Sequence, residues 1–85
     1  MKETNQILHE TFMEVVENQI RDNNPPETRK TYDRLISHGI SDKAARNYIG
    51  EAVCVEVWDT MRNNKEFNLK RFIKNLKNLP NEPQE

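Results

Sequence analysis

The sequence predicts an all-α fold, a compact bundle of four helices in which a long third helix is central. Apolar residues recur at helical spacing in four stretches, and residues that start or stop helices separate those stretches. No second alternating apolar run offers a partner for a strand. We expect one domain at residues 1–80 and a flexible tail at residues 81–85.

The first helix is expected from about residue 4 to residue 21. Its apolar residues recur at intervals that place them on one face: Leu8, Phe12, Val15, Val16 and Ile20. The opposite face is acidic and carries Glu3, Glu10, Glu14 and Glu17. This pattern predicts an amphipathic helix that packs its apolar face inward.

The second helix begins after Asn24, whose side chain is positioned to accept hydrogen bonds from the first-turn amides. Pro25 and Pro26 fit a helix start, because an N–H group at that point would have no helical partner. The helix is expected to end near His38.

A glycine turn separates the second helix from the third. Gly39 supplies the left-handed backbone that ends a helix, and Ile40 suits the apolar contact that accompanies such an end. Ser41 is then expected to cap the third helix.

The third helix is expected from about Asp42 to Arg62. In its first half one face is apolar and comprises Ala45, Tyr48, Ile49 and Ala52. In its second half the apolar residues point about 150° away and comprise Val53, Cys54, Val57 and Met61. Different neighbours are expected at its two ends, which makes this helix central. The alternating valines of residues 53–57 leave a strand as the competing interpretation.

Two further residues of this helix stand out. Glu56 falls on the side of Ala45 and Ile49, where a buried carboxylate would be costly unless paired and would mark a candidate functional site. The favoured interpretation is that the helix ends diverge, so that Glu56 reaches solvent. Trp58 lies off both apolar faces, and core packing is favoured over an exposed contact patch.

The fourth helix is expected from about Asn68, its N-cap, to Leu79, and Pro80 ends it. Its apolar face comprises Leu69, Phe72, Ile73, Leu76 and Leu79. Its other face is basic and comprises Lys70, Arg71, Lys74 and Lys77.

Charge is distributed unevenly along the chain. Residues 1–28 carry two basic and six acidic residues, whereas residues 60–79 carry six basic and one acidic. The favoured interpretation is that the first and last helices pack side by side with their polar flanks attracting. The alternative is a basic surface that binds an acidic partner.

No arrangement of residues predicts catalysis, a metal or a cofactor. His9 and His38 have no ligand at metal-binding spacing, so a structural role is favoured for both. The single cysteine, Cys54, cannot form an internal disulfide, and no apolar run has the length of a membrane span. We expect a non-enzymatic cytoplasmic protein that has no cofactor and does not contact a membrane.

The turn between the second and third helices resembles the DNA-binding helix-turn-helix. The resemblance rests on Arg34-Leu35-Ile36-Ser37-His38-Gly39-Ile40-Ser41, Ala44-Ala45 and Tyr48-Ile49. It implies a recognition helix from Ser41 to Gly50, with nucleic-acid contacts by Lys43, Arg46 and Asn47. The Gly39-Ile40 pair also resembles the first loop of the ubiquitin-associated domain.

Residues 24–80 are similar to small uncharacterised bacterial helical proteins, which are grouped as domains of unknown function. The resemblance rests on the order Asn-Pro-Pro, Arg-Leu, Gly, Ala-Arg, Ile-Gly, Phe and Leu-Pro. It implies a helical fold and a bacterial origin, and it brings no catalytic residues.

The leading functional hypothesis is therefore a non-enzymatic protein-interaction module of a bacterial cytoplasm. The expected surface for its unknown protein partner comprises Trp58, Lys70, Arg71, Lys74 and Lys77. Nucleic-acid binding is the alternative, although the formal net charge of −1 argues against a polyanion binder that relies on overall charge.

A homodimer is a further hypothesis, and a monomer is its rival. Exposed aromatic residues such as Trp58 and Phe67 could meet across a two-fold contact. Alternatively, the acidic flank formed by Glu10, Glu14 and Glu17 could meet the basic flank of the fourth helix of a second copy.

The core assignment gives a first testable prediction. Replacement of Ile49 by alanine is expected to lower the free energy of unfolding by roughly 2–5 kcal/mol, because it removes buried methyl groups. Lys74→Ala on a solvent-facing position is expected to change it by less than about 0.5 kcal/mol. Urea denaturation measures both values, and equal effects would contradict the assignment.

Overall fold

The helices of the computed structural model follow the four apolar stretches of the sequence. They are α1 (Lys2–Asp22), α2 (Pro26–Ser37), α3 (Asp42–Asn63) and α4 (Leu69–Asn78). The structure describes residues 2–83, with side chains from residue 10 onward. No strand occurs within residues 2–83, so the all-α prediction is confirmed and the strand alternative for residues 53–57 is wrong.

Some sequence predictions fall on positions that the structure does not describe. The side chains of Glu3, Leu8 and His9 lie outside the described residues, as do residues 84–85 of the predicted tail. Residues 81–83 carry no helix, and the backbone N–H of Asn81 donates to the carbonyl of Asn78 at 2.9 Å.

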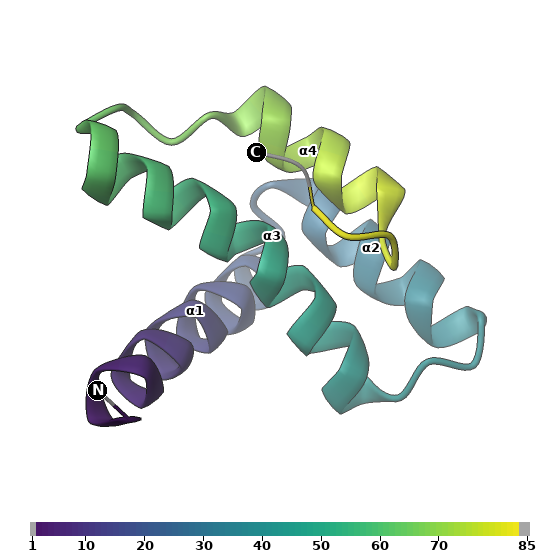
Figure 1. Ribbon diagram of the computed structural model, residues 1–85. Coiled ribbons are helices and arrows are strands. Elements are labelled where there is room, and N and C mark those ends of the chain that lie inside the picture. The colour runs from purple at the N-terminus through teal and green to yellow at the C-terminus, as the bar shows by residue number, and fades with distance from the viewer. Residues whose placement is uncertain (1, 84–85) are drawn as a thin grey trace.

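The long helix α3 crosses the middle of the molecule and packs against the three other helices (Figure 1). The prediction of a central third helix is confirmed. Helix α2 also contacts the three others, which the sequence analysis did not anticipate.

Helices α1 and α4 lie on opposite sides of α3 and do not contact each other through the described residues (Figure 1). The prediction that the first and last helices pack side by side is therefore wrong. Each of them packs against α2 and α3, and this leaves their charged flanks apart.

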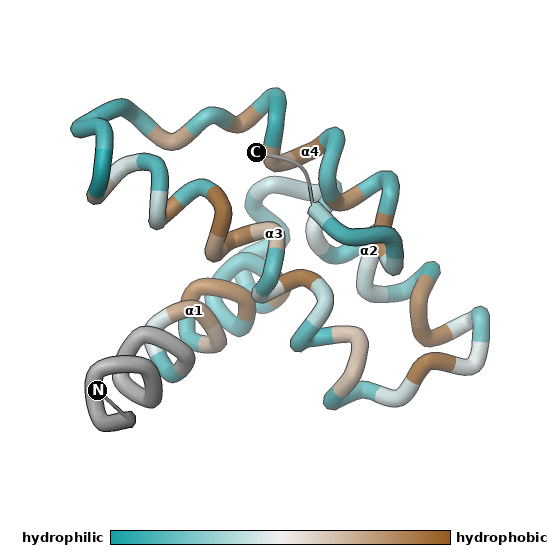
Figure 2. The backbone as a smooth tube through the Cα atoms, in the orientation of Figure 1, coloured by the Kyte–Doolittle hydropathy of each residue, from teal (hydrophilic) through white to brown (hydrophobic). Residues whose placement is uncertain are grey.

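The core draws apolar side chains from every helix, and Figure 2 shows hydrophobic positions on all four. The buried apolar residues are Val16, Leu35, Ala45, Ile49, Ala52, Val53, Phe72, Leu76 and Leu79. Phe12, Val15, Ile20, Tyr32, Ile40, Tyr48 and Val57 pack around this cluster and are partly buried. Most of the apolar positions predicted for α1 and α4 therefore meet the core, whereas Leu69 at the start of α4 is 49% exposed.

The two apolar faces predicted for α3 are covered unequally. The first continues as a buried stripe through Ala45, Ile49 and Ala52 to Glu56. Of the second face, Val53 is buried, whereas the Met61 side chain is 61% exposed. The C-terminal end of α3 extends beyond the start of α4 (Figure 1), and Trp58 and Met61 in this part of the helix are exposed.

Local hydrogen bonds explain the turns. Gly39 has a φ of 87°, and the N–H groups of Gly39 and Ile40 donate to the carbonyls of Ile36 and Leu35, which closes the C-terminus of α2 as predicted. The Ser41 hydroxyl accepts from the N–H of Ala44 at 3.1 Å, so the predicted cap of α3 is confirmed.

The predicted role of Asn24 is wrong. Asn24 belongs to the end of α1, because its N–H donates to the carbonyl of Gln19. The preceding residue, Asn23, has the left-handed φ of 52° that is typical of a helix end. The N-cap of α2 is Pro25, whose carbonyl accepts from the N–H of Thr28 at 3.1 Å.

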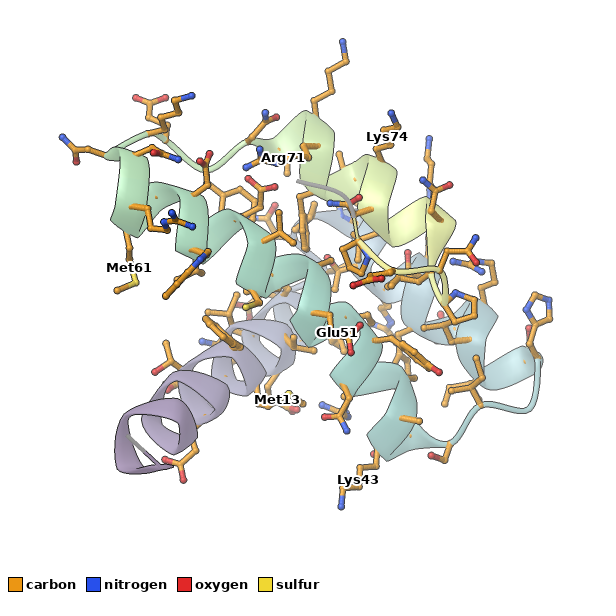
Figure 3. The ribbon with its side chains drawn as sticks, viewed as in Figure 1. Met13, Lys43, Glu51, Met61, Arg71 and Lys74 are labelled. Atoms are coloured by element: carbon orange, nitrogen blue, oxygen red, sulfur yellow. The ribbon has the colours of Figure 1, made fainter. Side chains whose placement is uncertain are left out.

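Gly50 allows α1 and α3 to approach closely. A Cβ atom at this buried position would lie 3.3 Å from the sulfur of Met13 and 3.9 Å from a methyl group of Val16. Figure 3 shows Met13 on α1 beneath α3. The absence of a side chain at residue 50 therefore sets how close the two helices lie.

We expect Gly50→Leu to lower the free energy of unfolding by roughly 1–3 kcal/mol, because the added side chain overpacks the α1–α3 contact. Gly50→Ala is expected to be nearly neutral, since the flexible end of Met13 yields while alanine favours the helix by up to about 1 kcal/mol. Thermal or urea unfolding distinguishes the two variants. A Gly50→Leu protein as stable as the parent would show that the helices are not in close contact here.

Candidate protein-binding surface

The surface around α4 is organised by one buried carboxylate. Glu56 on α3 has an exposed fraction of 0%, and its two oxygens accept three hydrogen bonds. Arg71 of α4 donates from Nε at 2.6 Å and from Nη2 at 2.9 Å, and the backbone N–H of Asn68 donates at 2.9 Å. A forked arginine–carboxylate pair of this kind fixes direction as well as distance.

Glu56 also completes the N-terminus of α4. Asn68 is the N-cap, and its side chain accepts from the N–H of Arg71 at 3.0 Å, which confirms the predicted cap. The backbone N–H of Asn68 itself is satisfied by Glu56 from another helix, a role that a glutamate three residues on plays in a capping box. The negative charge lies at the end of α4 where the helix dipole favours it.

Asp59 binds the same guanidinium from one turn further along α3. Its carboxylate accepts from Arg71 at 3.0 Å and from the side-chain amide of Asn63 at 2.6 Å. The hydrogen bond from Asn63, and after it that from Arg71, holds the pKa of Asp59 below its ordinary value. The hydrogen bonds that Arg71 donates to Glu56 and Asp59 raise the pKa of Arg71. Because folding lowers the pKa of Asp59, its stabilising contribution is present at neutral pH and is lost as the pH falls through that lowered pKa.

The structure thus corrects the interpretation of Glu56, which does not reach solvent. Its position on the same side of α3 as Ala45 and Ile49 already indicated burial. The positive charge that compensates the buried carboxylate is Arg71, fifteen residues further along the chain. Arg71 lies between α4 and α3 in Figure 3, with its side chain 23% exposed, whereas Lys74 projects away from the molecule.

The remaining basic residues of α4 form its outer face. Lys70, Lys74 and Lys77 are exposed and are spaced as i, i+4 and i+7, so they fall within about 60° of one another around the helix. We call these three residues the lysine row. Each ion pair found among residues 10–83 uses an arginine, so none of them neutralises the row.

The acidic residues of α1 are remote from the lysine row. Glu10, Glu14 and Glu17 are exposed on a helix that lies on the other side of α3 (Figure 1). Glu17 is paired with Arg46 of α3. The two oppositely charged flanks therefore remain separate surfaces.

Apolar side chains are exposed beside the Glu56–Arg71 pair. Trp58 is 43% exposed, so the favoured interpretation of core packing is wrong, and the predicted exposure of Phe67 is confirmed. A shallow cleft between α3 and the start of α4 is lined by Val55, Trp58, Asp59, Arg62, Asn63 and Arg71. The guanidinium of Arg62 lies 5.9 Å from the centre of the Trp58 ring.

The residues of the nucleic-acid alternative lie at the start of α3. Lys43 and Asn47 are exposed. The guanidinium of Arg46 binds Asp42 at 3.0 Å, pairs with Glu17 and lies over the ring of Tyr32. The hydrogen bond to Asp42 is the main cause that raises the pKa of Arg46. Arg46, the arginine of the predicted recognition helix, is therefore already paired within the protein.

Comparison with known proteins places the chain in a family. The family model described as Domain of unknown function (DUF1841) matches residues 1–78. The chain belongs to this family. No curated protein and no solved structure matches the chain.

Within the described residues, no group of three or more histidine, cysteine, aspartate or glutamate side chains is arranged to hold a metal ion. Across the same part of the chain, no helix combines the length and the apolar character that crossing a bilayer requires.

One structural residue of the DUF1841 domain escaped the sequence analysis. The guanidinium of Arg34 on α2 donates to the carbonyls of Leu76 and Leu79 at 3.0 and 2.9 Å, which are at the C-terminal end of α4. A cation is favourable there because the last carbonyls lack helical partners. Both ends of α4 are therefore held by side chains from other helices, Glu56 at one end and Arg34 at the other.

We expect Glu56→Gln to lower the free energy of unfolding by roughly 1–3 kcal/mol, because the buried carboxylate that accepts from Arg71 and Asn68 is lost while Asp59 still pairs with Arg71. Glu66→Gln is the matched control, since Glu66 is exposed in the loop before α4. Its effect is expected to be within about 0.5 kcal/mol. Urea denaturation provides the comparison, and similar midpoints for both variants would show that the Glu56 carboxylate does not hold α4.

Proposed function

We propose that this chain is a non-enzymatic protein-interaction module of a bacterial cytoplasm, which binds an acidic protein surface through the outer face of α4. The observation that carries the proposal is the lysine row, Lys70, Lys74 and Lys77, exposed on the side of the molecule away from the acidic flank of α1. Because the ion pairs among residues 10–83 leave these three lysines out, their charges are available to an external partner.

Charge complementarity would act on both the rate and the specificity of binding. A row of like charges along one helix face attracts an oppositely charged partner and rejects a basic one. The i, i+4, i+7 spacing matches the spacing of acidic residues along one face of a partner helix. An acidic helical segment is therefore the kind of partner that fits the row.

A rigid support favours this use of α4. Glu56 fixes the N-terminal end of the helix through Asn68 and Arg71, and Arg34 binds its C-terminal carbonyls. A face held at both ends loses little further freedom when a partner binds.

The non-enzymatic and cytoplasmic parts of the proposal rest on other features. The two carboxylates beside the cleft, Glu56 and Asp59, are both bound to Arg71, which leaves neither poised as a general base. The single cysteine is consistent with a reducing compartment, and the similarity to small bacterial helical proteins supports a bacterial source.

The proposal predicts salt-dependent binding of a labelled helical peptide with glutamates at i, i+4 and i+7, measured by fluorescence anisotropy. Combined Lys70→Gln, Lys74→Gln and Lys77→Gln substitutions are expected to weaken binding roughly tenfold, since three exposed ion pairs at about 0.5 kcal/mol each are removed. The same peptide with glutamines in place of glutamates is expected to bind about tenfold more weakly, because it lacks the same three ion pairs.

The matched control removes three exposed cations elsewhere, Arg29→Gln, Lys30→Gln and Lys43→Gln, and should leave binding nearly unchanged. Equal loss in both triple variants would reduce the effect to overall charge and overturn the proposal. Labelled duplex DNA and RNA are titrated at the same salt concentrations. Tight binding that requires Lys43 and Asn47 would favour the nucleic-acid function instead.

A further inference from the structure

A second surface, distinct from the lysine row, lies on the solvent side of α3. Cys54, Trp58 and Met61 are spaced as i, i+4 and i+7 and fall within about 60° of one another around the helix. Trp58 and Met61 are 43% and 61% exposed, and Cys54 is half-buried. We call these three residues the α3 seam. Apolar side chains at this spacing are the pattern by which one helix packs along another.

Opposite charges mark the two ends of the α3 seam. Glu51 is exposed one turn before Cys54, and Arg62 is exposed directly after Met61. Figure 3 shows Glu51 near the middle of α3 and Met61 projecting from the helix near its C-terminal end. No ion pair among the described residues involves either charge, although the Arg62 guanidinium lies over the Trp58 ring of its own chain.

This order, acidic, apolar, basic, is complementary to itself when two copies run antiparallel. A two-fold axis near residue 56 sets Glu51 beside residue 61 and Arg62 of the second copy, and sets Cys54 beside Trp58 of the second copy. Such a contact is isologous and closes after two subunits. The antiparallel direction also aligns the two helix dipoles favourably.

We infer that the chain forms a homodimer through antiparallel pairing of the α3 seams. The pairing covers the apolar side chains that one copy leaves exposed on α3 and joins Glu51 to Arg62 twice. A contact of three helical turns buries less than the roughly 1,200 Å² of a standard interface, so the expected Kd is on the order of 10 μM or weaker.

The inference does not depend on the proposed function, because the lysine row lies on α4 outside the paired faces. A rival mode of self-association would join the lysine row to Glu10, Glu14 and Glu17 of a second copy. Since α1 and α4 lie on opposite sides of the molecule, that contact would continue from copy to copy instead of closing as a dimer.

Sedimentation equilibrium over a hundredfold range of concentration tests the dimer. The weight-average mass is expected to rise from 10.1 kDa toward twice that value and to level off there. Met61→Glu is expected to hold the protein at the monomer mass throughout, because it places a carboxylate beside Glu51 of the second copy. Leu69→Ser removes an exposed apolar side chain outside the α3 seam and should leave the dimer intact.

A charge swap tests the antiparallel register. Glu51→Arg and Arg62→Glu are each expected to weaken the dimer about fivefold or more, and the double variant is expected to restore it. A short thiol-specific cross-linker should join two Cys54 residues, since Cys54 is the only cysteine of the chain. A constant monomer mass for the parent protein would overturn the inference. A dimer that resists Met61→Glu, or that requires the lysine row, would overturn it as well.

Discussion

The hydrogen-bonded pair between Glu56 and Arg71 is the interaction on which the rest of the structure depends. A carboxylate removed from water costs several kcal/mol unless close donors replace the lost solvation, and here three donors do so. The pair joins α3 to α4. Glu56 also accepts from the backbone N–H of Asn68, which fixes the end of the loop between the two helices. The pair fixes the N-terminal end of α4, while Arg34 at the other end and the buried Phe72 and Leu76 side chains complete the placement of the helix.

The direction of α4 decides what the surface presents. With Arg71 turned inward, the lysine row is left on the outer face, and the acidic flank of α1 lies across α3 from it. The uncovered side of α3 presents apolar residues instead, bounded by Glu51 and Arg62. The domain thus has a basic face and a separate apolar face, which we propose bind an acidic protein and a second copy respectively.

Local features of the fold were predictable because their causes lie within a few residues. Ser41 and Asn68 cap helices through side chains that bond three residues ahead, and Gly39 ends α2 because its backbone tolerates a positive φ. Contacts between distant segments were not predictable in this way. The burial of Glu56 depends on a cation that only the tertiary arrangement brings close, and uneven charge along the chain does not reveal which helices are neighbours.

Native-state hydrogen exchange at the amide of Asn68 tests the central role of Glu56 most directly. Backbone N–H groups at the start of a helix have no helical partner and ordinarily exchange fast. Because the N–H of Asn68 donates to a buried carboxylate, we predict that it exchanges far more slowly than the amides of Lys65 and Glu66 in the same loop. An Asn68 amide that exchanges as fast as those two would contradict the account, since Glu56 would then not hold the start of α4.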